Sequence, residues 1–283
     1  MIDIHSHLHF SDYDVDRGEI VRRAQETGVN KIICVGTSPE DNQKAVVVAE
    51  KYDDVFASVG IHPHFFKSQN KLENKEINEG VAQLKRIAQS SDKVIAIGEC
   101  GLDYFSRDPQ KNITGEQRVL QKEVFLAQME LARELKLPVI IHTRASAGTT
   151  DAYEDLFEIL RGTKYMVHNA ILHCYQGDIE ITKKFIKLPN VYFSFAGNIT
   201  YPIKKSLSGA KNDLREIIKL IPLERLYVET DCPYLAPEKK RGGRNEPAYV
   251  WLTARKVCTL EGITENVLEA ILDKNFCQVF EHC

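Results

Sequence analysis

Short apolar segments rich in β-branched residues alternate with longer segments of helical period along the whole 283-residue chain. This alternation is typical of βα units, in which each strand is followed by a helix that packs on a parallel sheet. Eight segments have the length and composition of buried strands. We expect these strands at 2–7, 31–35, 55–60, 94–98, 138–142, 170–174, 191–195 and 225–230.

Several helices can be placed from their first residues. Thr114 and Gln117 have the spacing of a capping box, and Pro138 predicts the end of that helix and the start of the fifth strand. The apolar face that follows the capping box consists of Leu120, Val124, Ala127, Leu131 and Leu135. Two further helices are predicted to begin at Pro247 and near Thr264 and to cover the outer wall of the fold.

The repeated strand–helix pattern indicates an α/β protein with a closed (β/α)8 TIM barrel. The chain has no glycine-rich phosphate loop, which disfavours an open, doubly wound sheet. No linker or low-complexity segment divides it, so we expect residues 1–283 to form a single barrel domain.

Composition and charge limit the compartments and the binding partners that we expect for this protein. With 43% hydrophobic and 27% charged residues, no bilayer-length apolar segment and no signal peptide, the chain is expected to be cytoplasmic and to bind no membrane. Seven cysteines without a CxxC pair favour neither a disulfide framework nor a zinc ribbon, and we expect reduced thiols. A net charge of −3 argues against a protein that grips long stretches of nucleic acid, but allows a substrate phosphate held locally by metal.

Chemically reactive side chains gather at the predicted carboxyl ends of strands, where barrel enzymes build their active sites. His5 and His7 stand two residues apart, so on a strand their side chains point to one face and converge. The later strand ends carry His62, His64, Glu99, His142, His173 and Asp231. Six of the nine histidines therefore lie at strand ends, and the others are His9, His168 and His282.

This residue set predicts a two-metal hydrolase. Imidazoles and carboxylates suit zinc, manganese and similar divalent ions, and Glu99 is the candidate bridge between two ions about 3.5–4 Å apart. The expected ligands are His5, His7 and Asp231 on one ion and His142 and His173 on the other. A hydroxide held between the ions would be the nucleophile, because metal coordination lowers the pKa of water.

Each position also has a plainer interpretation. His142 and His173 could be hydrogen-bonded core histidines, and the histidine pair of the first strand could be a polar strand end. Glu99 could cap the segment after it, and Asp231 could be a turn residue. All of these alternatives would have to hold together to remove the site, so we favour the metal centre.

The motifs that carry these residues resemble those of the TatD family of metal-dependent deoxyribonucleases, within the amidohydrolase-like barrels. They are DIHSHL at 3–8, GIHPH at 60–64, GECGLDY at 98–104, HTR at 142–144, HCY at 173–175, ETDCPYLAP at 229–237 and RGGRNEPAYV at 241–250. The resemblance implies a TIM barrel, two divalent ions (zinc, magnesium or manganese) and phosphodiester hydrolysis. In this family the activity is commonly that of a 3′-to-5′ exonuclease on DNA or RNA.

The resemblance also implies roles for single residues. The metal positions that match are His5, His7, Glu99, His142, His173 and Asp231. Asp231 would also orient or deprotonate the attacking water. His62 and His64 match a pair that lies near the substrate phosphate rather than on the metals, although they could instead be structural histidines braced by Pro63. Arg144 could clamp a phosphate or pair with a carboxylate.

Two loops could contact a nucleic acid. Lys239, Lys240, Arg241 and Arg244 follow the eighth strand and could meet a phosphate backbone. The alternative is a solvated basic loop in which Arg244 pairs with Glu246. Tyr104 and Phe105 could stack on a terminal base, although aromatic residues in loops more often anchor packing.

Three functions compete. We expect a monomeric nuclease whose substrates are the ends of single-stranded DNA or RNA. The first alternative is a metal-dependent amidohydrolase for a small C–N or ester substrate, and it is weakened because strand four carries Glu99 and no lysine follows before Lys111. The second is a metal-binding scaffold without activity, which the complete ligand set disfavours.

Overall fold

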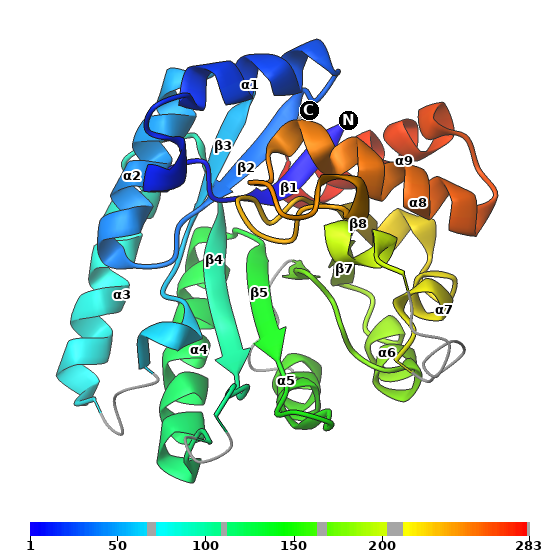
Figure 1. Ribbon diagram of the computed structural model, residues 1–283. Helices are drawn as coiled ribbons and strands as arrows, with labels where there is room; N and C mark the ends of the chain where they lie inside the picture. The colour runs from blue at the N-terminus through cyan, green and yellow to red at the C-terminus, as the bar shows by residue number, and fades with distance from the viewer. Residues whose placement is uncertain (67–71, 109–111, 163–168, 203–211, 282–283) are drawn as a thin grey trace.

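The computed structural model describes residues 1–66, 72–108, 112–162, 169–202 and 212–281. Its sheet has eight parallel strands in the order of the sequence, and each strand is hydrogen-bonded to the next. The strands are β1 (Ile2–Ser6), β2 (Lys31–Val35), β3 (Val55–Val59), β4 (Val94–Asp103), β5 (Val139–Arg144), β6 (Ala170–Leu172), β7 (Val191–Phe195) and β8 (Leu226–Val228). An isolated parallel bridge joins Ser6 to Cys232 after β8, so the sheet is nearly closed (Figure 1). The predicted barrel is confirmed.

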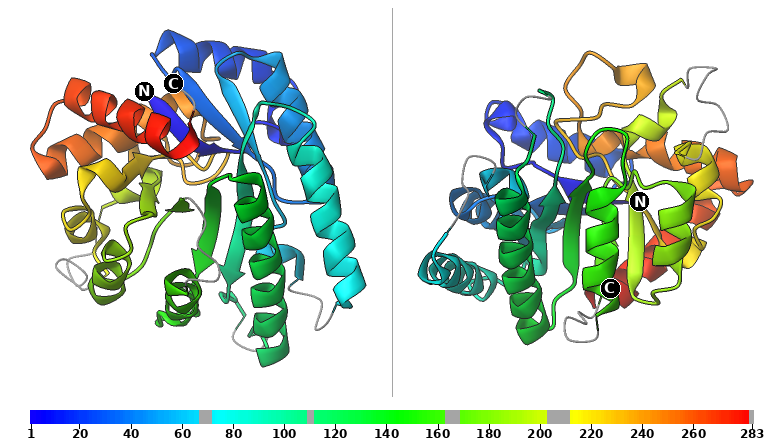
Figure 2. Two further views of the ribbon diagram at one scale, coloured as in Figure 1. Left: turned by 180° about the vertical axis from the view of Figure 1, so that it is seen from behind. Right: turned by 90° about the horizontal axis from the view of Figure 1, so that it is seen from below.

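The helices lie outside the sheet. They are α1 (Arg17–Glu26), α2 (Pro39–Lys51), α3 (Asn74–Ala88), α4 (Gly115–Leu135), α5 (Asp151–Arg161), α6 (Ile179–Ile186), α7 (Leu214–Ile218), α8 (Val250–Glu261) and α9 (Glu265–Phe280). Short 3-10 turns include η1 (Ser11–Tyr13), η2 (Pro63–Phe66), η5 (Gly197–Thr200), η7 (Leu223–Arg225), η8 (Glu238–Lys240) and η9 (Pro247–Tyr249). Figure 2 shows α3 and α4 side by side on the outside of β3 and β4, with which they are in contact.

The strands are apolar because helices cover one face of the barrel wall and the opposite face fills the interior. In β2, for example, Ile32, Ile33, Cys34 and Val35 are fully buried. All eight predicted strands are present, with β6 and β8 shorter than expected. The prediction for β4 is wrong at its end, because this strand continues to Asp103.

Local signals also place the helices correctly. Thr114 caps α4: its hydroxyl accepts the backbone N–H of Gln117 at 3.2 Å, and the Gln117 side chain accepts the backbone N–H of Thr114 at 2.9 Å. At the carboxyl end of the chain, Pro247 begins the turn η9 that leads into α8, and Thr264 caps α9. Helix α9 contacts β1 and β8, so it covers the wall where the barrel closes.

Composition led to two expectations, one on membrane-spanning segments and one on the state of the cysteines. The described residues include no helix with the length and hydropathy that a membrane crossing requires. Five cysteines are buried free thiols, namely Cys34, Cys100, Cys174, Cys232 and Cys258. Cys277 in α9 is disulfide-bonded, so the expectation of reduced thiols is wrong at that position.

Candidate active site

Two histidines at the end of β1 converge on one point, as their spacing predicts. The Nε2 atoms of His5 and His7 lie 3.4 Å apart, and both side chains are buried. Nδ1 of His7 donates to the carbonyl oxygen of Val35 in β2 at 2.8 Å. Because a carbonyl oxygen can only accept, the proton lies on Nδ1 and the lone pair of Nε2 points into the site.

Glu99 enters the same space from the interior of β4, between two glycines of positive φ, 140° at Gly98 and 141° at Gly101. A Cβ atom on Gly98 would lie 2.4 Å from the carbonyl oxygen of Ile140. One on Gly101 would lie 2.1 Å from that of His142. Only glycine fits this close approach of β4 to β5, and the pairing shifts register here. Glu99 is therefore a strand residue rather than the turn carboxylate of the plainer interpretation.

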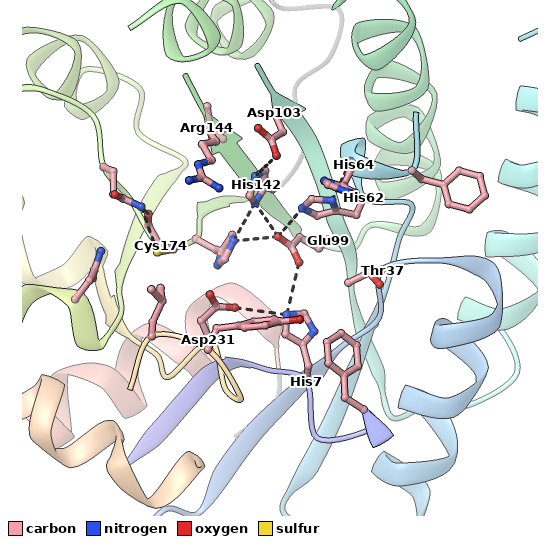
Figure 3. A pocket seen from close by; sticks show the side chains of 18 of the residues that line it. His7, Thr37, His62, His64, Glu99, Asp103, His142, Arg144, Cys174 and Asp231 are labelled. Carbon is pink, nitrogen blue, oxygen red and sulfur yellow. Dashed lines mark hydrogen bonds and ion pairs between the residues drawn. The ribbon is translucent and has the colours of Figure 1, made fainter. Parts of the chain in front are cut away.

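The two carboxylate oxygens of Glu99 face two groups of imidazoles, and Figure 3 shows Glu99 between His7 and His142. Its Oε2 atom lies 3.5 Å from Nε2 of His5 and 3.9 Å from Nε2 of His7. Its Oε1 atom lies 2.9 Å from Nδ1 of His142 and 3.0 Å from Nε2 of His173. One carboxylate thus connects the histidines of β1 with those of β5 and the segment after β6.

Asp231 joins the histidines of β1 from the segment after β8. Its Oδ1 atom lies 3.5 Å from Nε2 of His7 and 3.8 Å from Nε2 of His5. Its φ is 54°, and the preceding Thr230 is anchored by Asp3, which accepts the Thr230 backbone N–H at 2.8 Å and hydroxyl at 2.6 Å. Asp231 is a turn residue, but the turn directs its carboxylate at two histidines.

The spacing of these donor atoms fits divalent cations. Two ligands bound at about 2.1 Å in tetrahedral geometry lie about 3.4 Å apart. The Nε2 atoms of His5 and His7 are 3.4 Å apart, and so are Nδ1 of His142 and Nε2 of His173. Among the described residues, three groups with ligand atoms within 4.8 Å of one another could hold an ion: His5 with His173 and Asp231, His5 with His7 and Glu99, and His62 with Glu99 and His142.

The buried carboxylates and histidines of the site shift one another's pKa values. Burial by itself would raise the pKa of Glu99, but the surrounding histidines, His62 foremost, hold that pKa well below its usual range. Burial would lower the pKa of His173, yet Glu229 and Glu99 raise it well above its usual value. Buried carboxylates need compensating positive charge, which either protonated imidazoles or divalent cations supply.

Two buried carboxylates that sequence reasoning missed support the histidines. Glu229 accepts a hydrogen bond from Nδ1 of His173 at 3.2 Å, which leaves Nε2 of His173 directed at Glu99. Oδ2 of Asp103 lies 3.7 Å from Nε2 of His142. Asp103 lies four residues from Glu99 along β4, and the period of a strand is the signal that could have found it. Glu229 lies between β8 and the turn at Asp231, where that period does not apply.

Helix α4 fixes two of the segments that carry the site. The side-chain amide of Gln121 accepts the backbone N–H of Asp103 at 2.8 Å and donates to its carbonyl oxygen at 3.1 Å. Gln128 pairs in the same way with Ile61, at 2.7 Å and 3.1 Å. Because Ile61 precedes His62, one helix positions both the end of β4 and the turn after β3.

The second predicted histidine pair is placed unlike the first. Nε2 of His62 lies 3.3 Å from Oε1 of Glu99, and Nδ1 of His62 accepts the backbone N–H of His64 at 3.0 Å. Burial lowers the pKa of His62 to about 4, so at neutral pH the ring is neutral and carries its proton on Nε2. His64 is exposed at the cavity wall. The structure therefore brings His62, but not the ring of His64, to Glu99.

Among the described residues, His9 does not join this group. His9 is buried, with Nδ1 3.4 Å from Sγ of Cys34. His168 and His282 lie outside the described residues.

The site lines a cavity of about 890 Å³, within the range of about 300–1,000 Å³ that small-ligand sites occupy. Arg144 is exposed in its wall, with its guanidinium 3.8 Å from the ring centroid of Phe105. In the described part of the chain Arg144 forms no ion pair, so its pairing with a carboxylate is not supported. Tyr104 is buried and donates to Asp155 at 2.9 Å, which makes it a packing anchor.

The basic loop after Asp231 is held largely by contacts outside the cavity. Arg244 pairs with Asp16, so the expected alternative pairing with Glu246 is wrong. Arg241 lies 4.5 Å from the ring centroid of Tyr201, a residue of the cavity wall. Within the described ranges, none of the four basic residues of this loop lines the cavity itself, which favours the solvated-loop interpretation.

A barrel whose carboxyl end gathers imidazoles around a buried carboxylate, at the spacing of metal ligands, has the architecture of a metal-dependent hydrolase. The family model described as "TatD related DNase" matches residues 2–281, and the chain belongs to this family.

Relatives and solved structures agree with that assignment. The chain is 36% identical over 280 residues to "Uncharacterized metal-dependent hydrolase YabD" of Bacillus subtilis, which covers 99% of this chain and 98% of the relative. It is 32% identical over 284 residues to "3'-5' ssDNA/RNA exonuclease TatD" of Escherichia fergusonii, with 99% and 98% covered. The crystal structure of YjjV, a TatD homolog from Escherichia coli K12, superposes with a TM-score of 0.83 at 27% identity, with 100% and 98% covered.

Proposed function

We propose that this protein hydrolyses phosphodiester bonds at the 3′ ends of single-stranded DNA or RNA, as a metal-dependent 3′-to-5′ exonuclease. The observation that carries the proposal is the position of Glu99. One of its oxygens lies 3.5 Å from His5 and the other lies 2.9 Å from His142, so a single carboxylate faces both histidine groups. A carboxylate between two sets of nitrogen ligands suits a two-metal site for phosphoryl transfer. A full-length relative named as a 3'-5' ssDNA/RNA exonuclease supports the choice of substrate.

The distances between the donor atoms support two ligand sets. His5, His7 and Asp231 would hold one cation, His142 and His173 would hold the other, and Glu99 would contribute to both. Zinc, magnesium or manganese suits this donor set. When bound, the two cations supply Lewis-acid stabilisation of the phosphoryl group and lower the pKa of water.

The carboxylate of Asp231 orients the attacking water and accepts its proton. Burial opposes ionisation of this carboxyl group, but the nearby histidines, His7 first and then His173 and His5, lower its pKa below the usual value. Asp231 is therefore ionised at neutral pH and can act as a base. Its place 3.5 Å from Nε2 of His7 puts it beside the reacting centre.

Residues on the other side of Glu99 bind the phosphate. His62 carries its proton on Nε2 and donates it in a hydrogen bond to a phosphoryl oxygen, and His64 stands next to it at the cavity wall. Arg144 supplies a planar pair of donors for a phosphate, with its guanidinium already stacked on Phe105.

Single-stranded oligonucleotides labelled separately at the 5′ and 3′ ends test this function. Metal-stripped protein is supplied with zinc, magnesium or manganese in turn, beside an Asp231→Asn control. Early release of the 3′ label that depends on metal and is lost in the control is the expected result. If no ion restores cleavage, the nuclease proposal is wrong, and amide, ester or small phosphoester substrates would have to be screened.

A further inference from the structure

The active-site cavity has an aromatic wall beside the histidines of β1. Phe10 and Tyr234 line the cavity, and Tyr234 is 56% exposed. The ring of Phe10 stacks on His7 with centroids 4.7 Å apart and planes 10° apart. The ring of Tyr234 lies 6.2 Å from that of His7 and 6.3 Å from that of Phe10, edge to face in both cases.

The position of Tyr234 relative to the reacting centre is fixed by its backbone. Its N–H donates to the carbonyl oxygen of Asp231 at 2.9 Å, and its own carbonyl oxygen accepts from the side chain of Asn245 at 2.6 Å. Asn245 is fully buried and also donates to the carbonyl oxygen of Thr230 at 2.8 Å. A rigid aromatic ring loses little conformational entropy when a flat ligand stacks on it.

The opposite wall is cationic. Arg144 ends β5 and Arg107 follows β4, and both line the cavity. Figure 3 shows Arg144 and His7 on opposite sides of Glu99. Among the residues that the structure describes, neither arginine forms an ion pair. Strands β4 and β5 face β1 and β8 across the eight-stranded barrel, so the arginines lie opposite the aromatic wall.

This asymmetry matches the two sides of a scissile bond near a 3′ end. On one side the chain continues with further phosphates, which need cations. On the other side stands a single terminal nucleoside, which carries no further phosphate and whose base has flat π faces. Aromatic side chains bind bases by stacking, with little dependence on sequence.

We propose that Tyr234, backed by Phe10, is the stacking surface for the base of the 3′-terminal nucleotide, and that the chain leaves the site along Arg144 and Arg107. This subsite rests on the proposed exonuclease function. It makes Tyr234 a specificity-determining residue that selects a terminal nucleotide carrying a base.

Two oligonucleotides that differ only at the 3′ end test the subsite, one ending in thymidine and one ending in an abasic tetrahydrofuran residue. For the wild-type protein kcat/KM is expected to be at least about fivefold higher for the thymidine end. The Tyr234→Ala substitution should reduce this ratio towards one, and Tyr234→Phe, which keeps the ring, should restore it. Metal content and thermal unfolding of each variant show whether it is folded.

Phe65 provides a matched control, because it lines the same cavity and is 52% exposed but follows β3. Phe65→Ala is expected to keep the wild-type ratio. An unchanged ratio in Tyr234→Ala, or equal cleavage of the two ends by the wild type, overturns the subsite and leaves the nuclease function standing. No cleavage of either oligonucleotide by the wild type overturns the proposed function, and the subsite fails with it.

Discussion

Two segments of this chain carry the same His-x-His pattern at a strand end, and they build different structures. His5 and His7 bring their Nε2 atoms to 3.4 Å from each other. The rings of His62 and His64 have centroids 6.3 Å apart, and His64 is exposed. His5 lies in β1 and His7 directly follows it, and residues i and i+2 of a strand share a face. In the second pair Pro63 begins the turn η2, and in a 3-10 helix successive residues are about 120° apart, so the two rings diverge.

The two pairs also differ in the position of the proton. Nδ1 of His7 donates to a carbonyl oxygen, so its Nε2 has a free lone pair for a cation. Nδ1 of His62 accepts a backbone N–H, so its Nε2 carries the proton and is a donor. Although the group of His62, Glu99 and His142 has ligand spacing, this tautomer favours a phosphate donor at His62. The partner of Nδ1, rather than the motif, decides what each histidine can do.

The largest effect is expected at Glu99, on which both arrangements depend. Glu99→Ala removes the carboxylate that faces both histidine groups. Metal ions in such sites supply several kcal/mol of transition-state stabilisation, so kcat/KM should fall by at least about a thousandfold, together with metal content. Survival of the wild-type nuclease rate in this variant would contradict the mechanism.

The second-largest effect on activity is expected at His62. His62→Ala removes one donor to the phosphoryl group, and the loss of a comparable oxyanion donor costs about a hundredfold to a thousandfold in kcat. Steady-state kinetics on a labelled oligonucleotide measure this loss. Wild-type kcat in the variant would show that the proton on Nε2 plays no part in the reaction.

A smaller effect is expected at Glu229, which supports His173 as Val35 supports His7. Glu229→Gln keeps an acceptor oxygen for Nδ1 of His173 but removes the charge. Metal affinity should weaken by about tenfold, the smaller of the losses seen when a group that hydrogen-bonds a ligating histidine is changed. Glu123→Gln on the exposed face of α4 is the matched control. Competition with a chromogenic chelator measures the metal affinity of each variant. Equal affinities for Glu229→Gln and Glu123→Gln would show that Glu229 does not support metal binding.

The smallest effect is expected at His64. His64→Ala retains the backbone N–H that sets the tautomer of His62, and the ring that it removes is exposed. Because water screens the contact of an exposed ring with a phosphate, kcat/KM should change by less than about tenfold. A decrease as large as that of His62→Ala would give the ring of His64 a direct role.

Much of the fold could be predicted from sequence, because periodicity and capping residues act over a few positions. The capping box at Thr114 and the alternation of strands and helices are of this kind. The extension of β4 to Asp103 was missed, because the glycines around Glu99 permit a register shift that depends on contact with β5.

The candidate site likewise has parts that could be predicted from sequence and parts that could not. Residues at strand ends could be predicted as neighbours, since barrel topology brings all strand ends together. The partners that fix each imidazole could not, because the contacts of His7 with Val35 and of His173 with Glu229 join segments distant in the chain. The aromatic wall was missed for the same reason, since Phe10 and Tyr234 become neighbours only when β1 and β8 close the barrel.

Cation stoichiometry tests the central difference between the two histidine pairs most directly. Equilibrium dialysis of the metal-stripped wild type, His7→Ala and His62→Ala against a saturating divalent cation would count bound ions per chain. We predict two ions in the wild type, fewer than two in His7→Ala, and two in His62→Ala. Loss of an ion from His62→Ala equal to that from His7→Ala would contradict the account.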